Sequence, residues 1–275
     1  MAIDITLNAG ARNQLLALRH TANLIAGAEA RLTTGRKING PADGAGAWMR
    51  AAELTTRADT QSAVREEVDQ ARSALVAALD GVASAQALVE QMKSLALQAK
   101  ASGSSSERSA LATQFNDLRV QIDSLLNDAT YNGTTIVGDG AGNLVVRISD
   151  DGSKTHTVQG VDLTTDSAAG DIDAPSANWV TSIQIDASIA DVDAALSAYK
   201  VQARVIGSDA AFLQTRIDFL DDLSDTLRSG ADKLTLSDPN EDAVQLSSLE
   251  LRYDLAVQTL RQSAQREQRI FDLFV

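Results

Sequence analysis

The chain has 275 residues and a formal net charge of −13, with 44% hydrophobic but only 4% aromatic residues. This acidity disfavours nucleic acid and anionic membrane surfaces as partners, and the few aromatic residues favour many thin helix contacts over one thick core. Because the chain has no cysteine, disulfides, thiolate metal sites and thiol nucleophiles are excluded.

The N-terminal segment, residues 1–42, predicts a helix followed by a connecting loop. Its first ten residues lack the basic and apolar regions of a cleaved signal peptide, and no run of about eighteen apolar residues predicts membrane insertion. An apolar stripe at helical spacing follows. It consists of Leu15, Leu18, Ala22, Ile25 and Leu32. Alone, such a stripe is exposed, so we expect it to need a partner.

Residues 43–138 predict two long helices and a turn. Apolar positions alternate spacings of four and three without interruption, which is typical of a coiled-coil seam. They are Val64, Val68, Ala71, Leu75, Ala78, Val82, Ala85, Val89, Met92, Ala96 and Ala99. Ser104 and Glu107 form a capping pattern before a second seam from Leu111 to Ala129. Tyr131-Asn-Gly133 predicts the closing turn.

Residues 139–185 have a different character, since glycines cluster there and helix propensity is low. Two short runs, 144–149 and 154–158, flank an Asp-Asp-Gly-Ser turn. This pattern predicts a β-hairpin, and hence a small β-rich insertion.

Helical spacing returns in residues 186–236, with a seam from Ile189 to Leu234. Such a helix is roughly 75 Å long and must pack side by side with other rods. In residues 237–275, Asp238 and Pro239 are typical of a helix start. The last helix carries the stripe Leu246, Leu249, Tyr253 and Leu260.

A search for chemical motifs finds little. The two histidines, His20 and His156, have no carboxylate at metal-ligand spacing, so neither metal nor cofactor is expected. Gly44-Ala-Gly46 follows no strand and indicates a helix-opening turn more strongly than a phosphate loop. Asn132-Gly-Thr134 matches a glycosylation acceptor, but an Asn-Gly turn explains the same residues. No nucleophile–base pair indicates an enzyme.

The loop segment Arg31-Leu-Thr-Thr-Gly35, followed by Lys37-Ile-Asn39 and Asp43, resembles a sequence pattern of the bacterial flagellins. Met92-Lys-Ser-Leu-Ala-Leu-Gln98, Tyr131-Asn-Gly133 and the end of the chain from Ala264 to Phe274 resemble further family motifs. The resemblance covers about residues 1–138 and 186–275. It singles out the motif-loop residues Arg31, Gly35, Ile38, Asn39 and Asp43.

The resemblance implies a mainly α fold: a long antiparallel coiled-coil rod bundle, terminal helices that form an inner coiled coil, and a small β-rich hairpin insertion. It implies a structural subunit that is secreted and polymerises into the extracellular flagellar filament used for swimming. The implied partners are other flagellin subunits, the flagellar cap, hook–filament junction proteins, and the flagellar type III export apparatus with an export chaperone. We expect the filament contacts at Leu15, Leu18, Ala22, Ile25, Leu32, Leu246, Leu249, Tyr253, Leu260, Ile270, Leu273 and Phe274.

A vertebrate innate immune receptor recognises members of this family. By alignment, the region that this receptor contacts contains Gln91, Leu95 and Gln114 here. The family's activating pattern has an arginine and an acidic residue at the first and third of these positions. We therefore expect weak activation of the receptor.

Two alternatives remain at this stage. A hook–filament junction protein has similar terminal helices but only a few copies per flagellum. An intracellular coiled-coil binding module is less favoured, because it leaves the terminal patterns unexplained and predicts a stable monomer or closed oligomer.

Overall fold

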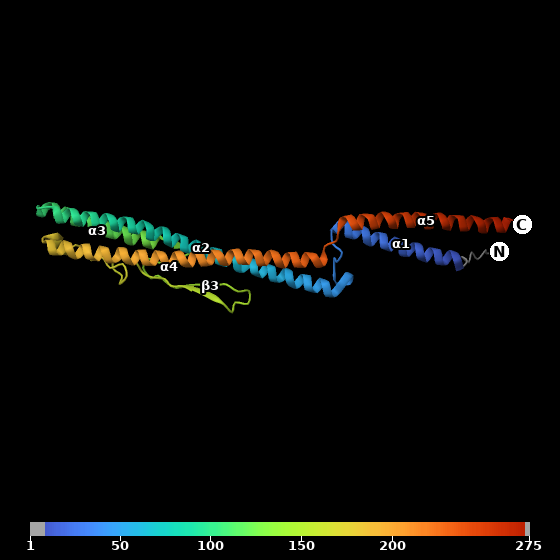
Figure 1. The fold of residues 1–275 in the computed structure, drawn as a ribbon, viewed down its shortest axis with the longest axis horizontal. Coiled ribbons are helices and arrows are strands. Elements are labelled where there is room, and N and C mark those ends of the chain that lie inside the picture. Colours follow the sequence, from blue (N-terminus) through green and yellow to red (C-terminus); the bar gives the residue numbers. More distant parts are fainter. Residues whose placement is uncertain (1–8, 273–275) are drawn as a thin grey trace. The chain divides into compact units, whose positions relative to one another are not determined.

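A computed structural model describes residues 9–272, which form long helices and a few short strands (Figure 1). The helices are α1 (Ala9–Thr34), α2 (Pro41–Ala101), α3 (Ser105–Asp128), α4 (Ser182–Thr235) and α5 (Pro239–Asp272), with a short helical turn η1 (Ser176–Trp179). The strands are β1 (Thr130–Tyr131), β2 (Thr134–Thr135), β3 (Leu144–Arg147) and β4 (Thr155–Val158). The predicted mainly α fold with a small β insertion is confirmed.

The chain divides into two compact units. Residues 57–225 form one, which we call the rod unit. Of the described residues, 9–56 and 226–272 form the other, which we call the terminal unit. The boundary between them passes through α2 and α4, and not through the loops that precede α2 and follow α4.

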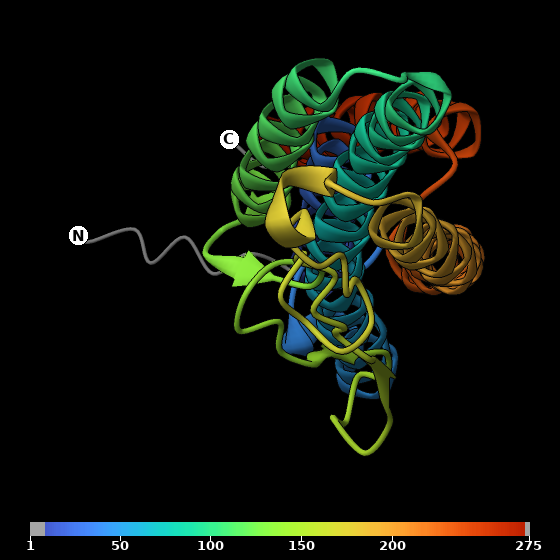
Figure 2. The same ribbon diagram turned by 90° about the vertical axis from the view of Figure 1, so that its left-hand side faces the viewer.

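The rod unit is a bundle of α2, α3 and α4, seen from one end in Figure 2. All eleven predicted seam positions between Val64 and Ala99 are buried. Phe115, Ile122 and Leu126 of α3 are buried with them, as are the α4 seam residues Val192, Tyr199, Ile206, Leu213, Ile217 and Leu220. Small alanines along α2 allow the helices to approach closely, which explains a core with so few aromatic residues.

The register between α2 and α4 is constant along the rod unit. Four of the side-chain links between the helices join pairs whose two residue numbers add to 286. The pairs are Ser62 with Ser224, Arg65 with Asp221, Lys93 with Asp193, and Lys100 with Asp186. The helices are therefore antiparallel and run without a slip. Matched heptad spacing on both helices explains this, since an insertion in either would shift the register.

Local signals set the helix ends. Ser104 accepts a hydrogen bond from the Glu107 backbone N–H at the start of α3, as predicted. The Glu107 carboxylate does not reach back to the Ser104 N–H. Instead it accepts from the Ser102 hydroxyl at 2.6 Å, and Ser102 Oγ accepts from the Ser104 N–H at 3.1 Å. Asp238 caps α5 by accepting from the Asn240 N–H at 2.9 Å.

The two small sheets are both antiparallel hairpins. In the first, Asn132 and Gly133 have positive φ values of 49° and 75°, which confirms the predicted Asn-Gly turn. In the second, Leu144 pairs with Val158 and Arg147 with Thr155. Hydrogen bonds from Ser149 and Ser153 lower the pKa of Asp151 in its turn to about 2.

The remaining residues of the insertion form an irregular loop anchored by Trp179. Its side chain is buried, its ring lies edge-on to Phe115 at 5.0 Å, and its Nε1 donates to Ser188 Oγ at 3.0 Å. The Tyr199 hydroxyl donates to the Leu163 carbonyl at 2.7 Å, and burial raises the pKa of Tyr199 above its usual range. Loop residues thus pack the insertion onto the rod unit together with the strand residues Val146 and Val158, which are also buried.

Among residues 9–272, α2 is the helix long and apolar enough to cross a membrane by length and composition, with an 18-residue window of mean hydropathy 1.2. A helix in the core of a bundle has the same composition. The buried seam of α2 gives it that role here.

Candidate assembly interface

The terminal unit is built on an α1–α5 pair, visible in Figure 1 as two helices side by side. The predicted stripe residues face into this pair or its edge. Leu15, Leu18, Ala22 and Ile25 are half-buried, and so are Leu246, Tyr253 and Leu260. Leu249 is 7% exposed, whereas Leu32 remains 39% exposed. The Ile270 side chain, Leu273 and Phe274 lie outside the described residues.

The pairing changes what the two stripes can do. Since α1 and α5 largely cover each other's predicted stripes, those residues hold the pair together within one subunit. A second set of apolar side chains stays exposed: Leu16 at 62%, Leu24 at 44%, Leu251 at 61% and Leu255 at 53%. These leucines were missed by the sequence reasoning, which followed one stripe per helix. Positions 251 and 255 share a helix face, so a search for a second stripe could have found them.

The motif loop between α1 and α2 is bonded to the loop between α4 and α5. Gly35 has φ +67°, a left-handed conformation that favours glycine, and its carbonyl accepts from the Ser237 N–H at 3.0 Å. The Lys37 N–H donates to the Thr235 carbonyl at 2.8 Å, and Arg36 pairs with Leu236 as an isolated antiparallel bridge. The loop before α2 is therefore fixed to the loop before α5 by backbone hydrogen bonds.

Asp43 and Ile38 order the start of α2. Asp43 Oδ2 accepts from the backbone N–H groups of Asn39 at 2.9 Å and Gly40 at 3.2 Å. The backbone at Gly44 is not helical, and a Cβ there would lie 3.2 Å from Ile38 Cδ1. The helix-opening turn expected at Gly44 is confirmed, and the close approach of Ile38 gives the glycine a packing reason.

Arg31 is the charged centre of the unit. Its Nε donates to Asp242 Oδ1 at 2.9 Å, and its Nη2 donates to Gln245 Oε1 at 3.0 Å. Asp242 is 4% exposed and also accepts from the Ser237 hydroxyl. Hydrogen bonds from Ser237 and Arg31 hold the pKa of Asp242 below its usual value. Nothing in the sequence paired Arg31 with residues so far along the chain.

The expected receptor region is brought together in the rod unit. Gln91 and Leu95 of α2 line one shallow groove with Gln114 of α3. Asp117, Leu118 and Gln121 complete the lining. The side chains at the two aligned positions, Gln91 and Gln114, are uncharged, as the sequence shows.

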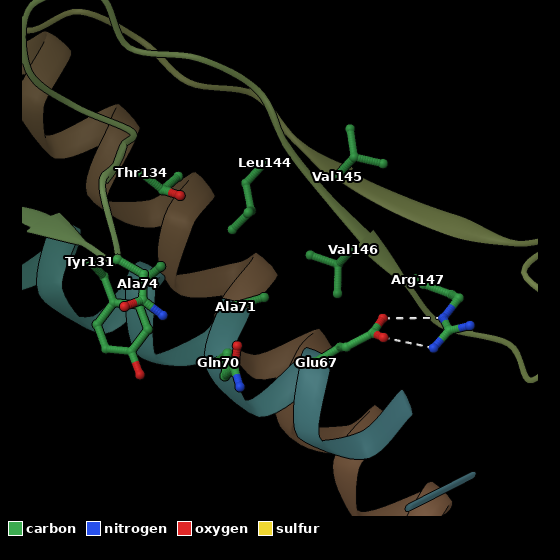
Figure 3. A pocket seen from close by; sticks show the side chains of 11 residues that line it. Glu67, Gln70, Ala71, Ala74, Tyr131, Thr134, Leu144, Val145, Val146 and Arg147 are labelled. Carbon is green, nitrogen blue, oxygen red and sulfur yellow. Dashed lines mark hydrogen bonds and ion pairs between the residues drawn. The ribbon is translucent and has the colours of Figure 1, made fainter. Parts of the chain in front are cut away.

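A second rod-unit pocket lies between α2 and β3 (Figure 3). Arg147 donates to both oxygens of Glu67, at 3.1 and 2.7 Å, and so holds β3 against α2. Tyr131 and Leu144 line other sides of this pocket.

His156 does not lie in a cluster of metal ligands. Its Nε2 contacts Asp209 Oδ1 at 3.1 Å, with no further ligand among the described residues. Among the described residues, no group of three His, Cys, Asp or Glu side chains could hold a metal ion.

These features define a class of protein: a helical structural subunit whose first and last helices, α1 and α5, are paired and still expose leucine side chains. Comparison with known proteins supports this class. The model of the bacterial flagellin N-terminal helical region matches residues 5–139. The chain is 28% identical over 282 residues to flagellin FljK of Caulobacter vibrioides, covering all of both chains, and 24% identical to a flagellin of Brucella melitensis, covering 98% of this chain and 99% of that one.

The fold is also similar to the crystal structure of Bacillus cereus flagellin, with a TM-score of 0.50 and 17% identity, over 56% of this chain and 88% of that chain. The chain belongs to the bacterial flagellin family, as its motifs suggested. It is a structural subunit of the flagellar filament.

Proposed function

We propose that this flagellin polymerises chiefly through the outer face of the α1–α5 pair. The observation that carries the proposal is the exposure of Leu16, Leu24, Leu251 and Leu255 after α1 and α5 have paired. Fully burying one leucine contributes roughly 1.5–3 kcal/mol, so four per subunit form a substantial contact when every subunit repeats it. The residues of the predicted stripes act with them, by keeping the pair in shape.

The wider cell biology follows from the family. We propose that the chain is exported through the flagellar type III apparatus with the help of a chaperone, and that it meets the cap and the hook–filament junction proteins outside the cell. The absence of cysteine supports transit between compartments, since no thiol must be protected or paired on the way.

The test is seeded growth of purified monomer on filament fragments. The double variant Leu251→Gln, Leu255→Gln should keep its helix content but lose growth, because its outer face is polar. Val120→Gln is the matched control, since Val120 is equally exposed, at 61%, but lies on α3 of the rod unit. Growth of the double variant at the wild-type rate would contradict the proposal.

A truncation gives an independent check. Deleting residues 266–275 should leave a soluble monomer that no longer polymerises. The number of copies per filament separates this function from that of a junction adapter, which occurs only a few times per flagellum. The relatives reported above are all named flagellins.

A further inference from the structure

Two rod-unit helices carry a second stripe opposite their buried seam. On α4, Val201 and Val205 are 51% and 43% exposed, and Phe212 and Phe219 continue the spacing at 43% and 50%. Val201 lies two positions after the buried Tyr199, which turns it about 200° around the helix. The part of the stripe at Val201 and Val205 therefore points away from the core of its own subunit, whereas Phe212 packs against His156 of β4, with ring centroids 4.5 Å apart.

The part of this stripe around residues 200–205, which we call the α4 patch, is also basic. It consists of Lys200, Val201, Arg204 and Val205. Neither Lys200 nor Arg204 forms an ion pair within residues 9–272, although the chain has 37 acidic against 24 basic residues. Most other basic residues of the rod unit pair with a carboxylate: Arg57, Arg65, Lys93, Lys100, Arg119 and Arg147.

The outer side of α2 has the opposite charge. We call it the α2 row: Glu66, Val76, Asp80, Ala83, Ala87 and Glu90. All six are exposed. Val76 also lies two positions before the buried Ala78, so the row faces away from the seam. Asp80 and Glu90 form no ion pair within residues 9–272, and Glu66 remains 62% exposed although Arg65 approaches it at 3.8 Å. The alanines between the charges allow a second helix to approach closely.

Within one subunit the α4 patch and the α2 row cannot meet, because both point away from the shared core. Two copies of the chain can bring them together. We propose that the α4 patch of one subunit docks on the α2 row of a second copy in the filament. The contact joins two different surfaces, so it is heterologous, and repeated heterologous contacts that do not close build a helical polymer. The inference rests on the proposed polymerisation and adds a rod-unit contact to it.

The register of the bundle shows which acids are in reach. Residue numbers of α2 and α4 at one level add to 286, so Lys200 and Arg204 lie level with positions 86 and 82 of α2. Asp80 and Glu90 flank these positions. Glu66 lies about 20 residues, roughly 30 Å, further along the helix. The row therefore offers carboxylates to a neighbour that is level and to one that is shifted along the rod.

Chemical coupling tests the contact in the assembled protein. Filaments are grown from a mixture of ¹⁴N- and ¹⁵N-labelled subunits and treated with a zero-length carbodiimide, which joins an amine to a touching carboxylate. We expect coupled peptides of mixed isotope that link Lys200 to Glu66, Asp80 or Glu90. Filaments in which Lys200 is coupled only within its own subunit, to other carboxylates, or not at all would overturn the inference.

Charge reversal supplies the second test. Lys200→Glu with Arg204→Glu should raise the critical monomer concentration roughly three- to tenfold at low salt, because attraction becomes repulsion. Adding Asp80→Lys and Glu90→Lys should restore it, while Lys154→Glu, an exposed reversal in the hairpin, should leave it unchanged. An unaltered critical concentration in the reversed variant would sink the idea. Because the terminal leucines stay intact, that result would leave the proposed function standing.

Discussion

Arg31 of α1 and Asp242 of α5 are 211 positions apart in the chain, yet Arg31 Nε lies 2.9 Å from Asp242 Oδ1. The pair closes the terminal unit next to the motif loop, where the backbones of residues 35–38 and 235–237 are already joined. It makes the position of α1 depend on a residue of α5 that lies far along the chain.

This pair predicts an acid-sensitive terminal unit. The pKa of Asp242 is lowered by Ser237 and Arg31, so its contribution to stability is present above the unfolded value of about 3.9 and is lost as the pH falls through the lower folded value. The protection factors of α5 amides, which compare the observed exchange with the intrinsic rate at the same pH, should therefore fall below about pH 4. In Asp242→Asn the carboxylate is gone, and this acid step should be weaker. An unchanged step in the variant would assign it to another group.

Gly35→Ala should destabilise the terminal unit through its backbone alone. No atom lies within 4 Å of the position a Cβ would take, but φ is +67°, and a non-glycine residue there costs roughly 1–2 kcal/mol. Gly46→Ala is the matched control, because that glycine is helical, has equal space and lies in the same unit. Thermal unfolding followed by circular dichroism should give a lower melting temperature for Gly35→Ala than for Gly46→Ala. Equal melting temperatures would mean that the loop relaxes around the alanine.

Gly81→Ala should destabilise the rod unit by overpacking. A Cβ at Gly81 would lie 2.5 Å from Ala129 Cβ, so the close approach of these two residues must open, at about 1–3 kcal/mol. Gly207→Ala in α4 meets nothing within 4 Å and should instead stabilise the unit, by about 1 kcal/mol. Ala129→Gly should partly rescue Gly81→Ala in denaturant titrations. Failure of that rescue would place the strain elsewhere.

Trp179→Ala should detach the insertion loop. The side chain is fully buried against Phe115, and removing it costs roughly 3–5 kcal/mol. Trp179→Phe keeps much of the ring contact but loses the bond to Ser188, at about 1 kcal/mol. Denaturant titration followed by circular dichroism should give both losses, because this measurement does not need the replaced tryptophan as its reporter.

Receptor activation should be weak. The groove presents the uncharged Gln91 and Gln114 where the family pattern has an arginine and an acidic residue. A reporter-cell assay with purified monomer should give a low response, and Gln91→Arg with Gln114→Glu should raise it. A wild-type response equal to that of a typical enteric flagellin would contradict this expectation.

The sequence by itself determined the helices and the inward side of the rod unit. Spacings of three and four select one face of a helix wherever it packs, so the seam from Val64 to Ala99 could be read directly and is buried throughout. Proline, glycine and Asn-Gly turns act locally, and for that reason the starts of α2 and α5 and the hairpin turns were also predictable.

Only the tertiary structure decided how these elements use their faces. A stripe such as Leu15–Ile25 says that a partner exists but not which one. Here α1 and α5 pack against each other, and Leu16 and Leu251 remain exposed on the outer face of the pair. The same holds for charges, because the partners of Arg31 and Lys93 are more than ninety residues away along the chain and depend on the antiparallel register. The spacing of apolar residues determines which face of one helix is buried. The partner of that face, and the register between the two helices, depend on the side chains of both helices and are set only when they pack.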